Sequence, residues 1–179
     1  YLGAALGMAA FTPALTGCGG GTDGDAAPAA DTGTVGEVVM PAGLSQVEID
    51  GLLFVVEEEK LAHDVYVALD ARWGSQVNVF GQIAPSETQH TQSVRDRILA
   101  HGLADPTEGK APGAFVNAEL QALYDTLVAQ GALSLIDALK VGCLIEEVDI
   151  QDLTDRTADV IGEPDIVRVY DGLMCGSRN

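Results

Sequence analysis

Residues 52–66 read Leu52-Leu53-Phe54-Val55-Val56-Glu57-Glu58-Glu59-Lys60-Leu61-Ala62-His63-Asp64-Val65-Tyr66. No proline interrupts the segment from Ser45 to Trp73, and one set of side chains recurs there at alternating steps of three and four residues, the spacing of one buried helix face. The set is Leu52, Val55, Glu59, Ala62, Tyr66, Leu69 and Trp73. Glu59 is its only charged member, and a carboxylate on a buried face is costly unless it is paired or bound to a cation. The stretch therefore predicts a long helix with a polar group at the centre of its inward face.

Helix signals divide the rest of the chain into four more segments. Ser45 with Glu48 forms a capping box at the start of the first helix. Further helices are expected over residues 78–101 with a break or kink near Pro85, over 117–130, over 134–156, and from Pro164 onward. The connection over residues 102–131 is far longer than the usual link between neighbouring bundle helices. We therefore predict an all-α fold with one long crossover that contains a short extra helix.

Two of these helices also carry polar residues in the middle of inward stripes. In the second helix the stripe is Ile83, Glu87, His90, Val94 and Ile98, and in the fourth it is Leu135, Leu139, Gly142, Glu146, Ile150 and Leu153. Glu87 and His90 are three residues apart and share a helix face, so they can bind one ion together. Glu146 is the only charge at the centre of its stripe, and Asp149 flanks it at the margin. Three helices are therefore expected to place polar side chains at the same level along the interior of the bundle.

A metal ion is the economical partner for these carboxylates. Basic residues such as Lys60 and Arg156 fall off the stripes, so an external cation is needed to balance Glu59, Glu87 and Glu146. Carboxylates with one imidazole suit iron or manganese, a bridging glutamate can hold two ions, and zinc remains an alternative.

The other acids and histidines of the chain have structural explanations. We expect Glu57 on a more solvated face and Glu58 at the margin of the seam. His63 lies off the seam, and His101 lies at a helix C-terminus, where a cation favours the helix dipole. These residues are not expected to bind the ion.

Composition excludes several functions. The formal net charge of −18 and the pI near 4.1 argue against binding of nucleic acid and against polybasic attachment to anionic lipid. The three cysteines form no C-x-x-C pair. Cys143 and Cys175 lie in apolar helical surroundings, which favours small buried side chains, and a disulfide between them is the alternative in an exported protein.

The first residues predict export. Residues 1–17 are apolar and uncharged, and Leu15-Thr16-Gly17-Cys18 resembles the lipobox at which bacterial lipoprotein signals are cut and acylated. Residues 19–44 are rich in Gly, Ala, Asp, Pro and Thr and are expected to form a disordered linker. We therefore expect a cell-envelope lipoprotein whose membrane anchor is Cys18, and the alternative is a general secretory signal. The N-terminus lacks a Met and a basic segment, so it is expected to be incomplete.

The helical part resembles a known family through motifs that are specific in combination. These are Glu57-Glu58-Glu59-Lys60-Leu61-Ala62-His63-Asp64-Val65-Tyr66, Ile83-Ala84-Pro85-Ser86-Glu87-Thr88-Gln89-His90, Ile145-Glu146-Glu147-Val148-Asp149-Ile150 and Gly176-Ser177-Arg178-Asn179. Over residues 45–179 the chain resembles the bacterial and archaeal ferritin-like family labelled domain of unknown function 2202. Ferritin-like di-metal proteins supply one Glu from each of two helices and a Glu-x-x-His from each of the other two.

The resemblance implies a ferritin-like four-helix bundle and a role for each motif. Glu59 and Glu146 are similar to the single carboxylates, Glu87 with His90 is similar to one Glu-x-x-His, and Tyr66 and Asp149 are expected to support the ligands through hydrogen bonds. The chain contains no second Glu-x-x-His. The family pattern has a His just beyond Asn179, so the chain is expected to be truncated there. The family also usually carries Arg at the position of His63.

The expected function is binding of one or two iron or manganese ions, with reaction toward oxygen or peroxide as the possible activity. The alternative is a non-catalytic binding or structural lipoprotein that keeps the ferritin-like fold. A homodimer is a possible assembly, and the sequence does not identify an electron donor.

Overall fold

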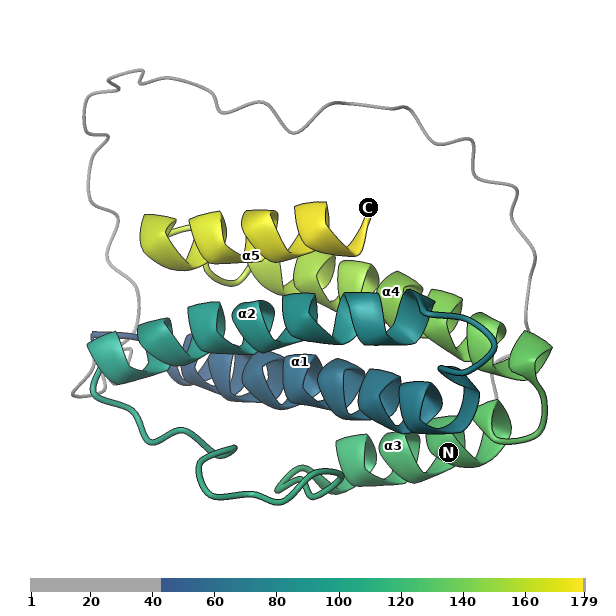
Figure 1. Ribbon diagram of the computed structural model, residues 1–179. Coiled ribbons are helices and arrows are strands. Elements are labelled where there is room, and N and C mark those ends of the chain that lie inside the picture. The colour runs from purple at the N-terminus through teal and green to yellow at the C-terminus, as the bar shows by residue number, and fades with distance from the viewer. Residues whose placement is uncertain (1–42, 179) are drawn as a thin grey trace, which may run out of the picture. The chain divides into compact units, whose positions relative to one another are not determined.

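The chain forms five helices in a computed structural model that describes residues 43–178. They are α1 (Gln46–Trp73), α2 (Val79–Ala100), α3 (Ala118–Gly131), α4 (Leu135–Thr157) and α5 (Pro164–Ser177) (Figure 1). The described part contains no strand, so the prediction of an all-α fold is confirmed, and each boundary lies close to its predicted residue. The expected signal, the lipid attachment residue Cys18 and most of the expected linker lie outside the described residues.

Side chains at the helix starts explain where the helices begin. The Ser45 hydroxyl accepts from the backbone N–H of Glu48 at 3.4 Å, and the Glu48 carboxylate accepts from the backbone N–H of Ser45 at 2.6 Å. The Asn117 side chain caps α3, and the Ser134 hydroxyl caps α4. Each cap contributes about 1 kcal/mol to helix stability. The predicted capping box at Ser45 is confirmed. α2 continues through Pro85, so of the predicted break or kink the break does not occur, and the kink stays a prediction.

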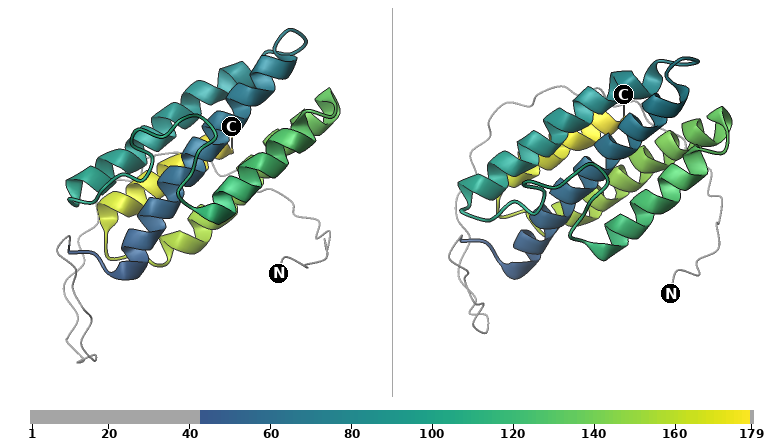
Figure 2. Two further views of the ribbon diagram at one scale, coloured as in Figure 1. Left: turned by 90° about the horizontal axis from the view of Figure 1, so that it is seen from below. Right: turned by 60° about the horizontal axis from the view of Figure 1, so that its bottom comes forward.

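Four helices form a ring of neighbours. α1 packs against α2 and α4, and α5 packs against α2 and α4, so the ring runs α1, α2, α5, α4. α3 belongs to the crossover and lies outside this ring, against α1 and α4 (Figure 2). No helix in the described part is both long and apolar enough to cross a membrane.

The apolar core has two clusters, and α1 contributes to both. One contains Val55 and Val56 of α1 with residues of α2, α4 and α5. The other contains Leu61 and Val65 of α1 with residues of α2, α3 and α4. The residues between these two sets on α1 are the three consecutive glutamates and Lys60. The polar layer therefore lies between two apolar clusters, where neighbouring helices shield it from water.

The inward face of α4 differs from its predicted stripe. Leu139 is exposed, and Ile150 and Glu146 are only half-buried. The buried residues of α4 are Ala138, Val141, Gly142, Ile145, Asp149 and Leu153. α4 contacts α1, α3 and α5, and the additional neighbour α3 shifts the buried arc away from the stripe expected for a simple bundle. Asp149 is consequently deeper than Glu146.

Cys143 also lies differently from its prediction. Its side chain is exposed and the thiol is free. The expected burial of Cys143 is therefore wrong, and so is the alternative of a disulfide to Cys175.

Candidate metal centre

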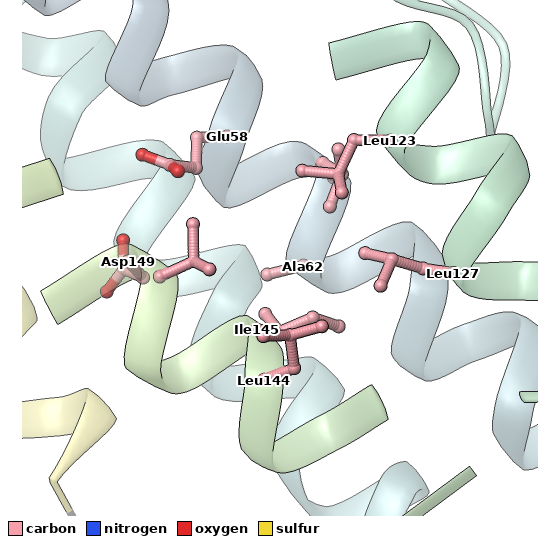
Figure 3. A pocket seen from close by; sticks show the side chains of 9 residues that line it. Glu58, Ala62, Leu123, Leu127, Leu144, Ile145 and Asp149 are labelled. Atoms are coloured by element: carbon pink, nitrogen blue, oxygen red, sulfur yellow. The ribbon is translucent and has the colours of Figure 1, made fainter. Parts of the chain in front are cut away.

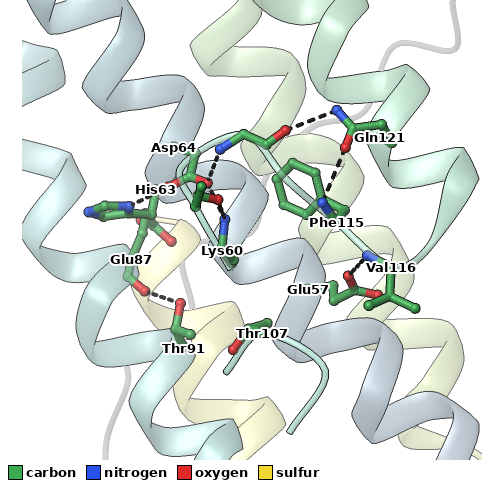
Figure 4. A network of polar contacts seen from close by, with 12 residues as sticks. Glu57, Lys60, His63, Asp64, Glu87, Thr91, Thr107, Phe115, Val116 and Gln121 are labelled. Carbon is green, nitrogen blue, oxygen red and sulfur yellow. Dashed lines mark hydrogen bonds and ion pairs between the residues drawn. The ribbon is translucent and has the colours of Figure 1, made fainter. Parts of the chain in front are cut away.

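Glu57, the first of the three glutamates, has a structural role. Its carboxylate accepts the backbone N–H groups of Val116 and Asn117, the latter at 3.0 Å, immediately before α3 (Figure 4). The side chain is only 4% exposed, so the expectation of a solvated face is wrong. The physical reason is a partner far along the chain, because the crossover returns to cover this face of α1. Both carboxylate oxygens are occupied by backbone donors, which leaves none for an ion.

Glu58 points toward α4 and is also buried, at 5% exposure, so its expected marginal position is wrong. Its carboxyl lies within hydrogen-bonding reach of Asp152, and its Oε2 has no partner among the residues described. Burial, then Asp152 and Asp149, raises the pKa of Glu58 well above its ordinary value. The neighbours of Glu58 are acidic, so their negative charge adds to burial in disfavouring its ionised form.

Glu59 lies close to Glu87 and His90, as the seams predicted. One oxygen of each carboxylate and one ring nitrogen of His90 all lie within 4.8 Å of one another. The Nδ1 atom of His90 lies 3.0 Å from Oε2 of Glu87 and 3.4 Å from Oε2 of Glu59. The three-residue spacing on α2 places Glu87 and His90 on one face, and α1 supplies the third group. An ion that replaced the shared proton would therefore meet three ligand atoms.

The orientation of the His90 ring is fixed by α5. A Cβ atom built on Gly176 would lie 2.5 Å from Nε2 of His90, closer than real Cβ contacts allow. Only glycine at position 176 therefore leaves room for the ring. Nε2 faces the backbone of α5 and Nδ1 faces the two carboxylates, so Nδ1 is the nitrogen available to an ion.

The charges of this group are incompletely balanced. Glu59 is 1% exposed, and its Oε1 has no hydrogen-bond partner in the described part of the chain. Burial first, and then Asp149 and Glu87, raises the pKa of Glu59. Burial opposes protonation of His90, but hydrogen bonds to Glu59 and Glu87 outweigh it and raise the pKa of His90. Without a metal, protons neutralise this group, and a divalent cation can displace them.

Glu146 lies to one side of the three-residue group. It is not within the 4.8 Å set, and its Oε1 accepts a hydrogen bond from the Tyr66 hydroxyl at 2.5 Å. Tyr66 is buried, and its hydroxyl also lies 3.2 Å from the carbonyl oxygen of Gly142. Burial, then Glu87 and Asp149, raises the pKa of Glu146 although the Tyr66 bond lowers it. The expected contact between Tyr66 and a candidate ligand is present.

Asp149 is the carboxylate whose depth the sequence misplaced. It is 5% exposed, its Oδ2 accepts from the Ser177 hydroxyl at 2.7 Å, and its Oδ1 has no partner among the described residues. Burial is the main cause that raises its pKa from 3.8 to about 6, and the charge of Glu87 adds to it. Asp149 lies at helical steps of three and four residues from the buried Ala138, Ile145 and Leu153. This spacing is a sequence signal that could have identified Asp149 as a buried carboxylate.

The other two histidines lie outside the group, as predicted. His63 contacts Asp64, whose carboxylate also accepts from Lys60 and from the backbone N–H of Gly113 (Figure 4). His101 lies near Glu163 and Asp165 in a second set of close ligand atoms. Asp165 already pairs with Arg97 at 3.2 Å, so this second set is less suited to a cation.

Comparisons with known proteins identify relatives of the whole helical part. Residues 48–179 match a family described as an uncharacterized protein domain, DUF2202. The uncharacterized protein MJ0754 of Methanocaldococcus jannaschii is 40% identical over 136 residues, which are 76% of this chain and 72% of the relative. The crystal structure of hypothetical protein MJ0754 from Methanococcus jannaschii matches with a TM-score of 0.73 and 40% identity, and covers 76% of each chain. The helical fold therefore has an experimental counterpart.

Proposed function

Since the chain belongs to the DUF2202 family of uncharacterized domains, we propose from the geometry of its polar layer that it binds iron or manganese in a ferritin-like helical bundle. Glu59, Glu87 and His90 would hold the first ion. Glu146 and Asp149 are the carboxylates available to complete its coordination or to hold a second ion. The ring of α1, α2, α5 and α4 supports this proposal, because it brings side chains from separate helices to one depth.

One observation carries the proposal: the unpartnered Oε1 of Glu59 in a carboxylate that is 1% exposed. A buried carboxylate oxygen without a donor is costly, and native proteins rarely leave one without a partner. No Lys or Arg pairs with Glu59 or Glu87 in the described part of the chain, where the nearest cationic group is His90. A bound cation would satisfy both carboxylates at once.

The donor set favours particular metals. Several carboxylate oxygens with one imidazole suit iron and manganese, and thiolate-loving ions are disfavoured because the group contains no cysteine. When bound, either metal supplies one-electron chemistry toward oxygen or peroxide. The protein would orient the ligands through Tyr66 on Glu146 and Ser177 on Asp149, and it would keep water out with the two apolar clusters.

A second candidate function is a non-catalytic lipoprotein that keeps the bundle. The observation that favours it is the composition of α5, which places Ser177 and Gly176 beside the polar layer and adds no ligand to the group of Glu59, Glu87 and His90. Both candidates include the proposal of export with a lipid anchor at Cys18. Labelling with a radioactive fatty acid, with and without Cys18→Ser, tests the anchor.

Metal analysis of the purified protein tests the main proposal. Protein loaded anaerobically with Fe²⁺ or Mn²⁺, and with Zn²⁺ for comparison, is desalted and analysed for bound metal by mass spectrometry. We expect at least one tightly held ion per chain, and its loss in Glu87→Gln and His90→Asn. Glu57→Gln is the matched control, because it changes a buried glutamate of α1 whose oxygens contact only backbone N–H groups.

Two results would contradict the proposal. The first is a wild-type chain that retains no metal after loading. The second is equal metal retention in Glu87→Gln, His90→Asn and wild type, which would place the ion elsewhere. Thermal unfolding of each metal-free variant establishes that a loss of metal is not a loss of fold.

A further inference from the structure

A small apolar cavity lies beside the polar layer, between α1, α3 and α4. Its volume is about 40 Å³. Its walls are Glu58, Leu61, Ala62, Leu123, Leu127, Leu144, Ile145, Val148 and Asp149. Figure 3 shows the two acidic residues at one end of the cavity and the α3 leucines at the other. The crossover helix α3 therefore closes a space that the ring of helices alone would leave open.

The cavity is suited to an apolar occupant. Its volume exceeds the 10 to 15 Å³, roughly, that one water needs, but a buried water also needs two to four polar partners. Aliphatic side chains make up the walls away from Glu58 and Asp149. Dry cavities with such walls bind small apolar molecules and gases. A polar molecule such as hydrogen peroxide would lose its hydrogen bonds to water on entry and could replace them only at the acidic end, where Glu58 Oε2 and Asp149 Oδ1 have no partner among the described residues.

The position of the cavity relates it to the candidate metal centre. Ala62 is one helical turn from Glu59 on α1, and Ile145 precedes Glu146 on α4. The acidic end of the cavity contains Asp149, whose charge raises the pKa of both Glu59 and Glu146 and which is therefore close to them. An occupant of the cavity lies next to Asp149, one of the carboxylates available to an ion, and next to Glu58.

The outer wall provides an entrance. Leu144 is 41% exposed although it lines the cavity, whereas Leu61 and Leu127 are buried. Leu144 therefore lies between the cavity and solvent, and we expect a change of its rotamer to widen access from the α3–α4 surface.

We propose that this cavity is a binding site for a small apolar gas and that it holds dioxygen, rather than peroxide, next to the carboxylate cluster. The proposed gas binding depends on the cavity alone. The proposed role of the cavity as a store of dioxygen for a reaction rests on the proposed metal-binding function. Between the two oxidants that suit such a centre, the aliphatic walls of the cavity favour dioxygen. Ala62 is the residue that keeps the cavity open, because a larger side chain there would fill it.

Dioxygen contact in the metal-free protein tests the binding. Methyl groups of Leu, Ile and Val are labelled with ¹³C, and their paramagnetic relaxation is measured under increasing pressure of dioxygen. We expect the largest relaxation at Leu61, Leu123, Leu127 and Val148, well above the methyls of the other apolar cluster, such as Leu52 and Leu153. Ala62→Leu should remove this excess, and Ala71→Leu, the same change at an exposed position of α1, should keep it.

Relaxation that is uniform over the buried methyls, or an excess that survives in Ala62→Leu, would overturn the proposal. Leu127→Phe fills the cavity from α3 and replaces Ala62→Leu if that variant does not fold. The wild-type measurement needs no variant, so the proposal stays testable in either case.

The role in the reaction has its own measurement. In protein loaded with Fe²⁺, Ala62→Leu should raise the dioxygen concentration needed for half-maximal iron oxidation several-fold, while the maximal rate and the oxidation by peroxide stay unchanged. Equal effects on dioxygen and peroxide would contradict the role. A chain that binds no iron but shows localised dioxygen would refute the proposed function and leave the gas site standing. A chain that binds iron but shows uniform relaxation would refute the gas site alone.

Discussion

Asp64 and Glu59 are buried carboxylates of the same helix, five residues apart, yet their surroundings differ. Asp64 accepts from Lys60 and from the backbone N–H of Gly113, and it contacts Nδ1 of His63 at 3.0 Å. Burial opposes its charge, but these donors outweigh burial and lower the pKa of Asp64. Glu59 is equally buried, its Oε1 has no donor in the part of the chain described, and its pKa is raised. The donors decide which carboxylate is structural and which is available to an ion.

Stability measurements on these two carboxylates provide the largest expected difference. Asp64→Ala removes the common partner of Lys60, His63 and the Gly113 N–H, and we expect the free energy of unfolding to fall by about 3 to 5 kcal/mol, as when one member of a buried ion pair is removed. Glu59→Gln in the metal-free protein should change it by less than about 1 kcal/mol, because burial already raises the pKa of Glu59 and only the 3.4 Å contact with His90 is altered. Urea unfolding followed by circular dichroism gives both values. A larger loss for Glu59→Gln would reverse the assignment of the two carboxylates.

A change at Gly176 tests whether the orientation of the His90 ring matters, without altering any candidate ligand. The added methyl group of Gly176→Ala would lie 2.5 Å from Nε2 of His90 and must displace the ring. We expect metal affinity to fall about 10- to 100-fold, as for other residues that orient metal ligands. Titration calorimetry measures the affinity, and Gly172→Ala is the control, because a Cβ there meets no neighbouring atom. Unchanged affinity in Gly176→Ala would show that the ring orientation does not matter.

The pH dependence of the metal-free protein is expected to follow the raised carboxylates. A carboxyl group whose pKa is raised on folding keeps a proton that the unfolded chain releases, so its stabilising effect is present at low pH and is lost as pH rises through the folded pKa. For Asp149 this window runs from about pH 4 to about pH 6. We therefore expect Asp149 alone to lower the stability of the metal-free protein by about 2 kcal/mol between pH 4.5 and pH 7, and the raised pKa of Glu59 to lower it further.

Thermal unfolding across this pH range checks the prediction, and Asp149→Asn should flatten the decrease. The lowered pKa of Asp64 acts in the opposite direction, but below this range, because its window ends near its ordinary value of 3.8. Bound metal should stabilise the protein more at pH 7 than at pH 5, since protons compete for the same oxygens. Stability that rises with pH in the metal-free protein would show that the buried carboxylates are ionised.

The helices and much of the polar layer could be predicted from the sequence because both depend on local spacing. The caps at Ser45, Asn117 and Ser134 mark helix starts, and steps of three and four residues place Glu59, Glu87 and His90 on inward faces. Their meeting required only that α1 and α2 pack side by side with these faces in contact.

The errors arose where a distant segment decides the burial. Glu57 appeared solvated because its donors, Val116 and Asn117, are about 60 residues away. Asp149 appeared marginal because α3, which widens the buried arc of α4, belongs to a crossover whose path the spacing does not reveal. Local periodicity identifies one buried face, and it cannot show that a second neighbour covers the adjacent one.

The three consecutive glutamates of α1 also limit how this chain can change in length. Successive residues of an α-helix point about 100° apart, so Glu57, Glu58 and Glu59 face the crossover, α4 and α2 respectively. A substitution at one of these positions mainly affects the segment that this glutamate faces. A deletion or insertion of one residue before this turn would rotate all three at once and give every glutamate the wrong neighbour. Insertions in this family should therefore be tolerated in the crossover between α2 and α3 and excluded from the first half of α1.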